Sequence, residues 1–193
     1  NLLSHSSGFA SWRGPYTTGT GIDHYIQDFA DSQPEAEPNS RVAYSCLGFI
    51  TLGEVVRRVS GLAIDQYAAQ YVFGPLGMKD TMFLPPAELR SRIAATEFGN
   101  DHEHPMAETN PVEGWRDYLV RGEVHDGNAW YGLHGISGNA GAFGTADDLL
   151  GYANMWLNGG ELDGVRILPE DIVQEATREQ TGLSDPNERR GLG

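Results

Sequence analysis

Residues 45–60 read SCLGFITLGEVVRRVS, and this stretch carries the clearest secondary-structure pattern in the chain. Four apolar residues recur at the spacing i, i+3, i+4, i+7: Leu52, Val55, Val56 and Val59. That spacing lines one face of an α-helix, and Gly61 directly after it is a typical helix stop. We therefore predict a helix over residues 45–60.

The segments around this helix carry further start and stop signals. A second helix is predicted from Ile64 to Phe73, before Gly74-Pro75, and the two form a hairpin. Pro85-Pro86 opens a shorter helix through about Ala94. Thr145 and Asp148 form a capping box, which predicts a helix through about Leu157, closed by Asn158-Gly159-Gly160. A turn at 162–164 then leads to Val165–Leu168, and Pro169 opens the last helix.

Two segments lack such periodicity. Residues 100–115 are polar and contain two prolines, which predicts a long surface loop and a candidate mobile segment. Residues 132–144 hold five glycines, which indicates positive φ angles or a close backbone approach.

Composition excludes several classes of function. Thirteen basic residues against 27 acidic ones give a formal charge of −14, so a nucleic-acid partner is not expected. No apolar run reaches the length of a membrane span in this segment. The single cysteine, Cys46, cannot form an internal disulfide, and neither compartment nor oligomeric state follows from the sequence. A G-x-S-x-G elbow, a Walker loop and a G-x-G-x-x-G loop are all missing from these residues.

Histidines and carboxylates raise the question of a metal site. Asp101, His102, Glu103 and His104 lie together in the polar loop. Zinc sites on helices favour pairs at i, i+4, so we favour a solvated loop and predict no metal. His125 and Asp126 would point to opposite faces of a strand, so they are not a ready-made dyad. The alternative interpretation, in which His125 or Asp126 forms hydrogen bonds with buried backbone groups, is at least as well supported.

Tyr44 lies at the start of the strongest helix. A tyrosine there can act as a general base if neighbouring cations lower its pKa from about 10. By residue type alone it is more commonly a half-buried core residue.

Several stretches, in order along the chain, resemble segments of the serine beta-lactamase-like hydrolases, which include class C beta-lactamases, DD-peptidases and related esterases. They are LLSHSSG at 2–8, YSCLGF at 44–49 with LGEVV at 52–56 and VSG at 59–61, PLGMKDT at 75–81, GEVHD at 122–126 with NA at 128–129, and GNAGAFGTADDL at 138–149. The resemblance implies an α+β, beta-lactamase/transpeptidase-like fold, of which residues 1–193 form a single incomplete domain, mainly the helical subdomain.

The resemblance also implies a mechanism and two candidate site residues. In the family a serine forms an acyl-enzyme without a metal or organic cofactor. Tyr44 matches the second motif's tyrosine, which assists proton transfer, and is our catalytic candidate. Cys46 stands where the motif usually has asparagine, and is our substrate-binding candidate. A thiol is a poor amide partner, which argues against beta-lactam recognition. The glycine turn 138–141 either shapes the pocket wall or packs against a helix.

Two family motifs have no counterpart in these residues. Ser-x-x-Lys is missing, because Lys79, the only lysine, follows Leu76 at the required spacing. The strand motif Lys-Thr-Gly or His-Thr-Gly is missing as well, and Arg190–Gly193 resembles the lead-in to its strands. We therefore expect a fragment cut at both ends, without most of the antiparallel sheet, with exposed apolar surface and marginal stability.

Four functional hypotheses remain. The first is a serine hydrolase fragment that acts on a small-molecule ester, amide or peptide substrate, with an esterase favoured because of Cys46 and the glycine turn. A beta-lactamase or DD-peptidase is the alternative within the family. A non-catalytic binding module and a metal-dependent enzyme that uses His102 and His104 are the alternatives outside it.

The missing nucleophile gives a first prediction. The 193-residue chain alone is expected to form no acyl-enzyme, because the serine and the cation that would lower the pKa of Tyr44 are both lacking. Mass spectrometry after incubation with a serine-reactive phosphonate checks this. Stoichiometric labelling of the chain would refute the expectation that it is a fragment.

Overall fold

The computed structural model describes residues 1–192, apart from the side chains of Ala107 and Thr109. Gly193, the last residue of the predicted lead-in Arg190–Gly193, lies outside the described residues. The elements in chain order are η1 (Pro15–Thr17), α1 (Ile22–Asp31), α2 (Cys46–Ser60), α3 (Ile64–Ala68), η2 (Ala69–Phe73), β1 (Met82–Phe83), η3 (Ala87–Arg92), α4 (His104–Thr109), η4 (Asn128–Gly132), β2 (Ala142–Phe143), α5 (Ala146–Leu157), β3 (Glu161–Leu162), β4 (Val165–Arg166), α6 (Glu170–Thr177) and η5 (Pro186–Glu188).

Helix α2 confirms the strongest sequence prediction. Ser45 caps its first turn and Gly61 ends it in the left-handed conformation, with φ 76°. Leu47 and Ile50 enter a core that also contains Tyr16, Tyr25 and Phe29. Val59 of the predicted apolar face is 84% exposed. The buried face of α2 is the neighbouring one, which residues of α1 and η1 cover.

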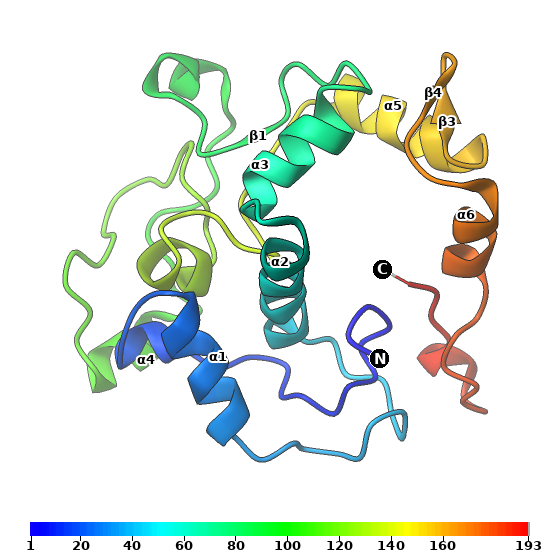
Figure 1. Cartoon of the computed structure of the whole chain (residues 1–193). Helices are drawn as coiled ribbons and strands as arrows, with labels where there is room; N and C mark the ends of the chain where they lie inside the picture. Colours follow the sequence, from blue (N-terminus) through cyan, green and yellow to red (C-terminus); the bar gives the residue numbers. More distant parts are fainter. Residues whose placement is uncertain (193) are drawn as a thin grey trace.

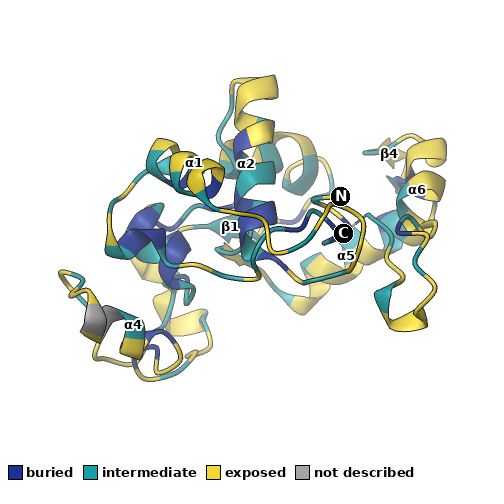
Figure 2. Ribbon diagram, turned by 90° about the horizontal axis from the view of Figure 1, so that it is seen from below, coloured by how far each residue is buried: buried dark blue, intermediate teal, exposed yellow. Residues whose placement is uncertain are grey.

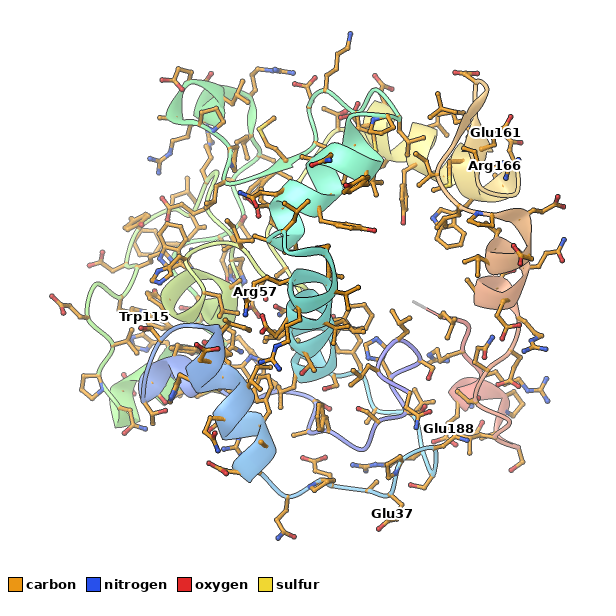
Figure 3. All side chains as sticks on the ribbon, in the orientation of Figure 1. Glu37, Arg57, Trp115, Glu161, Arg166 and Glu188 are labelled. Atoms are coloured by element: carbon orange, nitrogen blue, oxygen red, sulfur yellow. The ribbon has the colours of Figure 1, made fainter. Side chains whose placement is uncertain are left out.

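The chain is arranged around α2, which lies near the middle of the molecule (Figure 1). Buried positions gather in α2 and the segments beside it, whereas α5 and α6 are mostly exposed or half-buried (Figure 2). The described C-terminal segment, up to Leu192, returns to the side of the molecule where the N-terminal segment lies (Figures 1 and 2). The backbone N–H of Val42 donates to Glu188 Oε1 at 3.2 Å, which ties the C-terminal segment to the residues before α2 (Figure 3).

The sheet content of the described residues is small, as expected. Strand β1 pairs antiparallel with β2, with Met82 opposite Phe143 and Phe83 opposite Ala142. Strands β3 and β4 form a second ribbon around the turn at 162–164, where Arg166 donates to Glu161 at 2.6 Å (Figure 3). These short antiparallel ribbons among helices are consistent with a partial α+β domain.

The remaining helices match their sequence signals with two exceptions. The predicted helix from Ile64 to Phe73 is present as α3 followed by a π-helical turn, η2. Pro85-Pro86 leads into a 3₁₀ helix, η3, and α6 follows Pro169 as predicted. Helix α1 is not among the predicted helices, although its apolar residues have the helical spacing: Ile22, Tyr25, Ile26 and Phe29.

The second exception is the predicted surface loop at 100–115. It contains the short helix α4, and Asn100 and Glu103 at its start are buried. The carboxylate of Glu103 accepts hydrogen bonds from the Tyr16 hydroxyl at 2.6 Å and the Gly127 backbone N–H at 2.9 Å. The prediction of a mobile loop was therefore wrong for this part of the segment, because these polar side chains bond buried partners rather than water.

Helix α5 is joined to the turn at 75–81 by one carboxylate. Thr145 caps the helix by accepting from the backbone N–H of Asp148 at 3.2 Å, which confirms this half of the predicted capping box. The Asp148 side chain accepts instead from the Asp80 backbone N–H at 2.9 Å and the Thr81 hydroxyl at 2.8 Å. The glycine-rich segment is thus held to β1 by its own strand, β2, and by the start of α5.

This junction gives a stability prediction. Asp148→Ala removes the acceptor of two hydrogen bonds and is expected to lower the free energy of unfolding by about 2–3 kcal/mol. The neighbouring Asp147 is exposed and lies on the same helical turn, so Asp147→Ala is the matched control, with an expected loss below about 1 kcal/mol. Urea denaturation of both variants measures the difference. Equal losses would show that the link contributes nothing.

Candidate active site

Tyr44 precedes Ser45, the N-cap of α2, and hydrogen bonds of Ser45 and Cys46 hold the backbone there. The Ser45 hydroxyl donates to the Ala10 carbonyl at 2.7 Å and accepts from the Gly48 N–H at 3.2 Å. The backbone N–H of Cys46 donates to the Ser11 carbonyl at 2.9 Å. These bonds secure the backbone on the C-terminal side of Tyr44, whose side chain is 65% exposed. The catalytic candidate is therefore held at the backbone and presented at the surface.

His5 of the LLSHSSG segment packs against this tyrosine. Its ring centroid lies 4.6 Å from that of Tyr44 and 4.9 Å from that of Phe49. Its Nδ1 accepts from the Ser45 backbone N–H at 3.1 Å, so Nδ1 must be unprotonated for the bond to form. Burial, followed by the charge of Arg190, holds the pKa of His5 below its ordinary value. His5 is therefore a neutral support for the start of α2.

The glycine turn 138–141 packs on the other side of the helix start. A Cβ built on Gly138 would lie 2.0 Å from the Phe49 carbonyl oxygen, and one built on Gly53 would lie 3.1 Å from the backbone nitrogen of Gly138. This contact supports the interpretation that the glycines serve packing against a helix. In the same segment the Ser137 hydroxyl donates to Asn139 Oδ1 at 2.6 Å.

Asp126 completes the group of side chains. It is partly buried and accepts from the Ala129 backbone N–H at 2.8 Å, which confirms that one of the His125-Asp126 pair serves backbone groups. His125 points to a different partner, with Nε2 2.5 Å from Glu97 Oε1. Neither Asp126 nor Asn139 was among the predicted site residues, although Asp126 has the i, i+3 spacing of a cap to Ala129.

The site is electrostatically acidic. Burial, the Cys46 thiol and the charge of Asp126 all raise the pKa of Tyr44. Burial and Asp126 likewise raise the pKa of Cys46, against hydrogen bonds from Asn139 and Tyr44 that lower it. Burial also raises the pKa of Asp126 itself. Within the described residues these influences keep Tyr44 and Cys46 protonated.

A groove of about 340 Å³ opens beside Asp126. Its lining includes Glu123, His125, Asp126 and residues 140–143. A separate cavity of about 250 Å³ lies between α2, the start of α3 and the glycine-rich segment, and neither Tyr44 nor Cys46 lines it. Tyr44 and Cys46 do not line the groove beside Asp126 either, so neither hollow is lined by the two predicted site residues.

The histidines of the polar segment do not gather into a metal centre. His104 Nδ1 lies 3.5 Å from Glu108 Oε1, and its ring packs against Trp115. Within residues 1–192, excluding the two undescribed side chains, the structure brings together no group of three or more potential ligands. The metal-dependent alternative built on His102 and His104 therefore has no site in this part of the chain. In the same residues, no helix is long and apolar enough to cross a membrane.

The comparisons with known proteins assign the class. The family described as Beta-lactamase matches residues 1–193, so the chain belongs to the beta-lactamase family of serine hydrolases. A Salmonella schwarzengrund protein named "Putative D-alanyl-D-alanine carboxypeptidase" is 33% identical over 151 residues, which are 75% of this chain and 33% of that protein. A Salmonella newport protein of the same name is 32% identical over the same shares. The chain spans about a third of the length of these relatives.

Solved structures show the same fold at low sequence identity. A penicillin-binding protein from Bacillus halodurans superposes with a TM-score of 0.65 and 19% identity, covering 99% of this chain and 55% of that one. A beta-lactamase/D-alanine carboxypeptidase from Pseudomonas syringae gives 0.63 and 19%, covering 92% and 42%. The predicted beta-lactamase/transpeptidase-like fold is confirmed.

The bond to His5 gives a pH-dependent prediction. His5→Ala leaves the Ser45 N–H without its acceptor and is expected to cost about 1–3 kcal/mol of unfolding free energy. His5→Asn retains an acceptor near the Nδ1 position and tolerates the positive φ of 55°, so it should lose less than half as much.

The sign of the pH dependence follows from the lowered pKa. Because the folded chain holds the pKa of His5 below its ordinary value of about 6.5, the unfolded chain binds more protons near and below that pH. The free energy of unfolding of the wild type therefore decreases as the pH is lowered through this range. His5→Asn should remove this contribution, as measured by urea denaturation at about pH 5.5 and 7.5. His102→Asn, at an exposed histidine, is the control. An unchanged slope in His5→Asn would contradict the assignment.

Proposed function

We propose that the protein containing this chain hydrolyses ester or amide bonds through an acyl-enzyme, with Tyr44 as its proton-transferring residue. The observation that carries the proposal is the placement of Tyr44, whose exposed side chain stands at the capped start of α2 beside Cys46. Membership in the beta-lactamase family supplies the chemistry.

In this mechanism the oxygen of a serine carried by another part of the protein attacks the substrate carbonyl carbon. Tyr44, as phenolate, takes the serine proton and delivers it to the departing oxygen or nitrogen. Water then attacks the acyl-enzyme, gives its proton to Tyr44, and the serine regains a proton as the acid leaves. Because Cys46 and Asp126 raise the pKa of Tyr44, a cation outside the described residues must oppose them to make the phenolate available.

Esters are the substrates that we favour. At the position of Cys46 the family motif usually has an asparagine, whose side-chain amide can hydrogen-bond an amide substrate, and a thiol does this poorly. Cleavage of D-alanyl-D-alanine peptides is the second candidate, supported by the names of the Salmonella relatives.

The role of Tyr44 is testable in the complete protein. Tyr44→Phe removes only the hydroxyl and is expected to lower kcat by about 10²–10⁴-fold with little change in KM. Tyr71 is a partly exposed tyrosine in the adjacent helical turn η2, and Tyr71→Phe should leave kcat unchanged. Steady-state hydrolysis of a chromogenic ester measures both. Full activity of Tyr44→Phe would exclude its proton-transfer role.

Substrate preference separates the remaining candidates. The complete protein is assayed with a p-nitrophenyl ester, a D-alanyl-D-alanine peptide and a cephalosporin, and acyl-enzyme is followed by mass spectrometry. Preferred ester turnover supports the favoured proposal, and preferred release of D-alanine supports the peptidase. A folded complete protein that acylates with none of them is the non-catalytic binding module.

A further inference from the structure

The cavity of about 250 Å³ beside α2 is lined by none of the residues Tyr44, Cys46 and Asp126. Its walls come from the start of α1, the middle of α2, the start of α3 and the segment at 133–138. The lining is mostly apolar and includes the half-buried side chains of Ile22, Ala63, Ile64, Leu133 and Ile136. The cavity is therefore an apolar space between helices, separate from the candidate active-site residues.

The size of this cavity suits a small molecule. Protein interiors are ordinarily close-packed, so an apolar cavity of this volume is a space that a ligand can fill. A Cβ built on Gly21, in the wall of the cavity, would meet no atom within 4 Å. An apolar cavity of about 150 Å³ is sufficient to bind benzene, so about 250 Å³ admits a benzene ring with one further small group.

The lining also contains an arginine with an unused edge. The guanidinium of Arg57 donates from Nε and Nη2 to the carboxylate of Glu54, at 2.6 and 2.8 Å (Figure 3). Within residues 1–192, no side chain or backbone carbonyl that the structure describes accepts a hydrogen bond from its Nη1. The Arg57 side chain is 49% exposed, which places it where the cavity meets solvent. A ligand carboxylate can therefore bond Nη1 without displacing Glu54.

The carboxylate of Glu54 lines the cavity as well, but its charge is compensated. Glu54 is 4% exposed and accepts a third hydrogen bond from Arg58 Nε at 2.6 Å. Two guanidiniums thus bond one carboxylate, which leaves a net positive charge here in a chain whose formal charge is −14. The exposed Asp23 of α1 also acts on Arg57 through its charge. His134 of the lining adds a positive charge when it is protonated.

We propose that this cavity binds a small carboxylate with an apolar body of about the size of a benzene ring. The apolar body occupies the space between α1, α2 and α3, and the carboxylate accepts from Arg57 Nη1. Burial of apolar surface supplies affinity, whereas the charge-assisted hydrogen bond selects an anion over a neutral molecule of the same shape. The proposal does not rest on the function of Tyr44, because the cavity is lined by other residues.

Benzoate and benzamide test the two parts of the site, because they share a ring and differ in charge. The complete protein is titrated with each probe by isothermal titration calorimetry. Benzoate is expected to bind with a Kd of about 0.1–1 mM, about tenfold tighter than benzamide. Equal affinities of the two probes, or no binding of benzoate at about 10 mM, would overturn the proposal.

Two arginines of α2 provide matched variants. Arg57→Gln removes the guanidinium from the lining and should weaken benzoate binding by about five- to twentyfold, while benzamide changes by less than about twofold. Arg58→Gln removes the same charge and also a bond to Glu54, but Arg58 does not line the cavity. Its effect on benzoate should stay below about twofold. Equal losses in the two variants would mean general charge attraction and would overturn the proposal.

A third variant tests the location of the bound probe. Ala63→Leu enlarges a side chain of the lining and should weaken both benzoate and benzamide by about tenfold or more. Circular dichroism checks that the variant is folded. Unchanged binding to the folded variant would place the probes elsewhere, the candidate active site included, and would overturn the proposal. If Ala63→Leu does not fold, the comparison of Arg57→Gln with Arg58→Gln decides.

Discussion

The close approach of Gly138 to α2 is the constraint on which the candidate site depends. A side chain on Gly138 would meet the Phe49 carbonyl oxygen at 2.0 Å, and one on Gly53 would meet the Gly138 backbone at 3.1 Å. Two glycines must therefore face each other for the glycine-rich segment to lie on the helix. Packing against α2 therefore accounts for Gly138, whereas Ala140 and Gly141 of the same turn line the groove beside Asp126. The two interpretations of the glycine turn do not exclude each other.

A second layer of buried polar groups supports the other half of the site. Glu103 accepts from Tyr16 and from the backbone of Gly127, so the segment at 100–103 is tied both to η1 and to the turn after Asp126. Arg116 bonds the backbone before Asp126 and stacks on Trp130 and Tyr131. Turns without a regular ladder need such partners to satisfy their backbone groups. A site built on irregular segments is therefore held by side chains rather than by a sheet.

Local sequence signals predicted most of the helices, and the resemblance of the motifs predicted the family, but neither predicted this polar framework. The cap and glycine stop of α2, and the threonine cap of α5, are contacts within a few residues, which a sequence displays directly. The bond between Tyr16 and Glu103 spans 87 positions, so Glu103 looked like part of a solvated loop. Likewise the apolar spacing of Val55 and Val59 specifies a helical face but not what covers it, and in the described residues Val59 is largely uncovered.

The surroundings of Tyr44 raise its pKa, and this limits the proton transfers in which the side chain can take part. Burial, Cys46 and Asp126 each favour its protonated form. A phenol that stays protonated can donate a proton to a leaving group but cannot accept one from a nucleophile. A cation placed beside Tyr44 reverses this preference, and the nearby negative charge of Asp126 in turn favours the binding of that cation. Asp126 thus disfavours ionisation of Tyr44 in this chain, but it also favours the binding of a cation that would promote this ionisation. General-base catalysis at Tyr44 becomes conditional on assembly of the complete site.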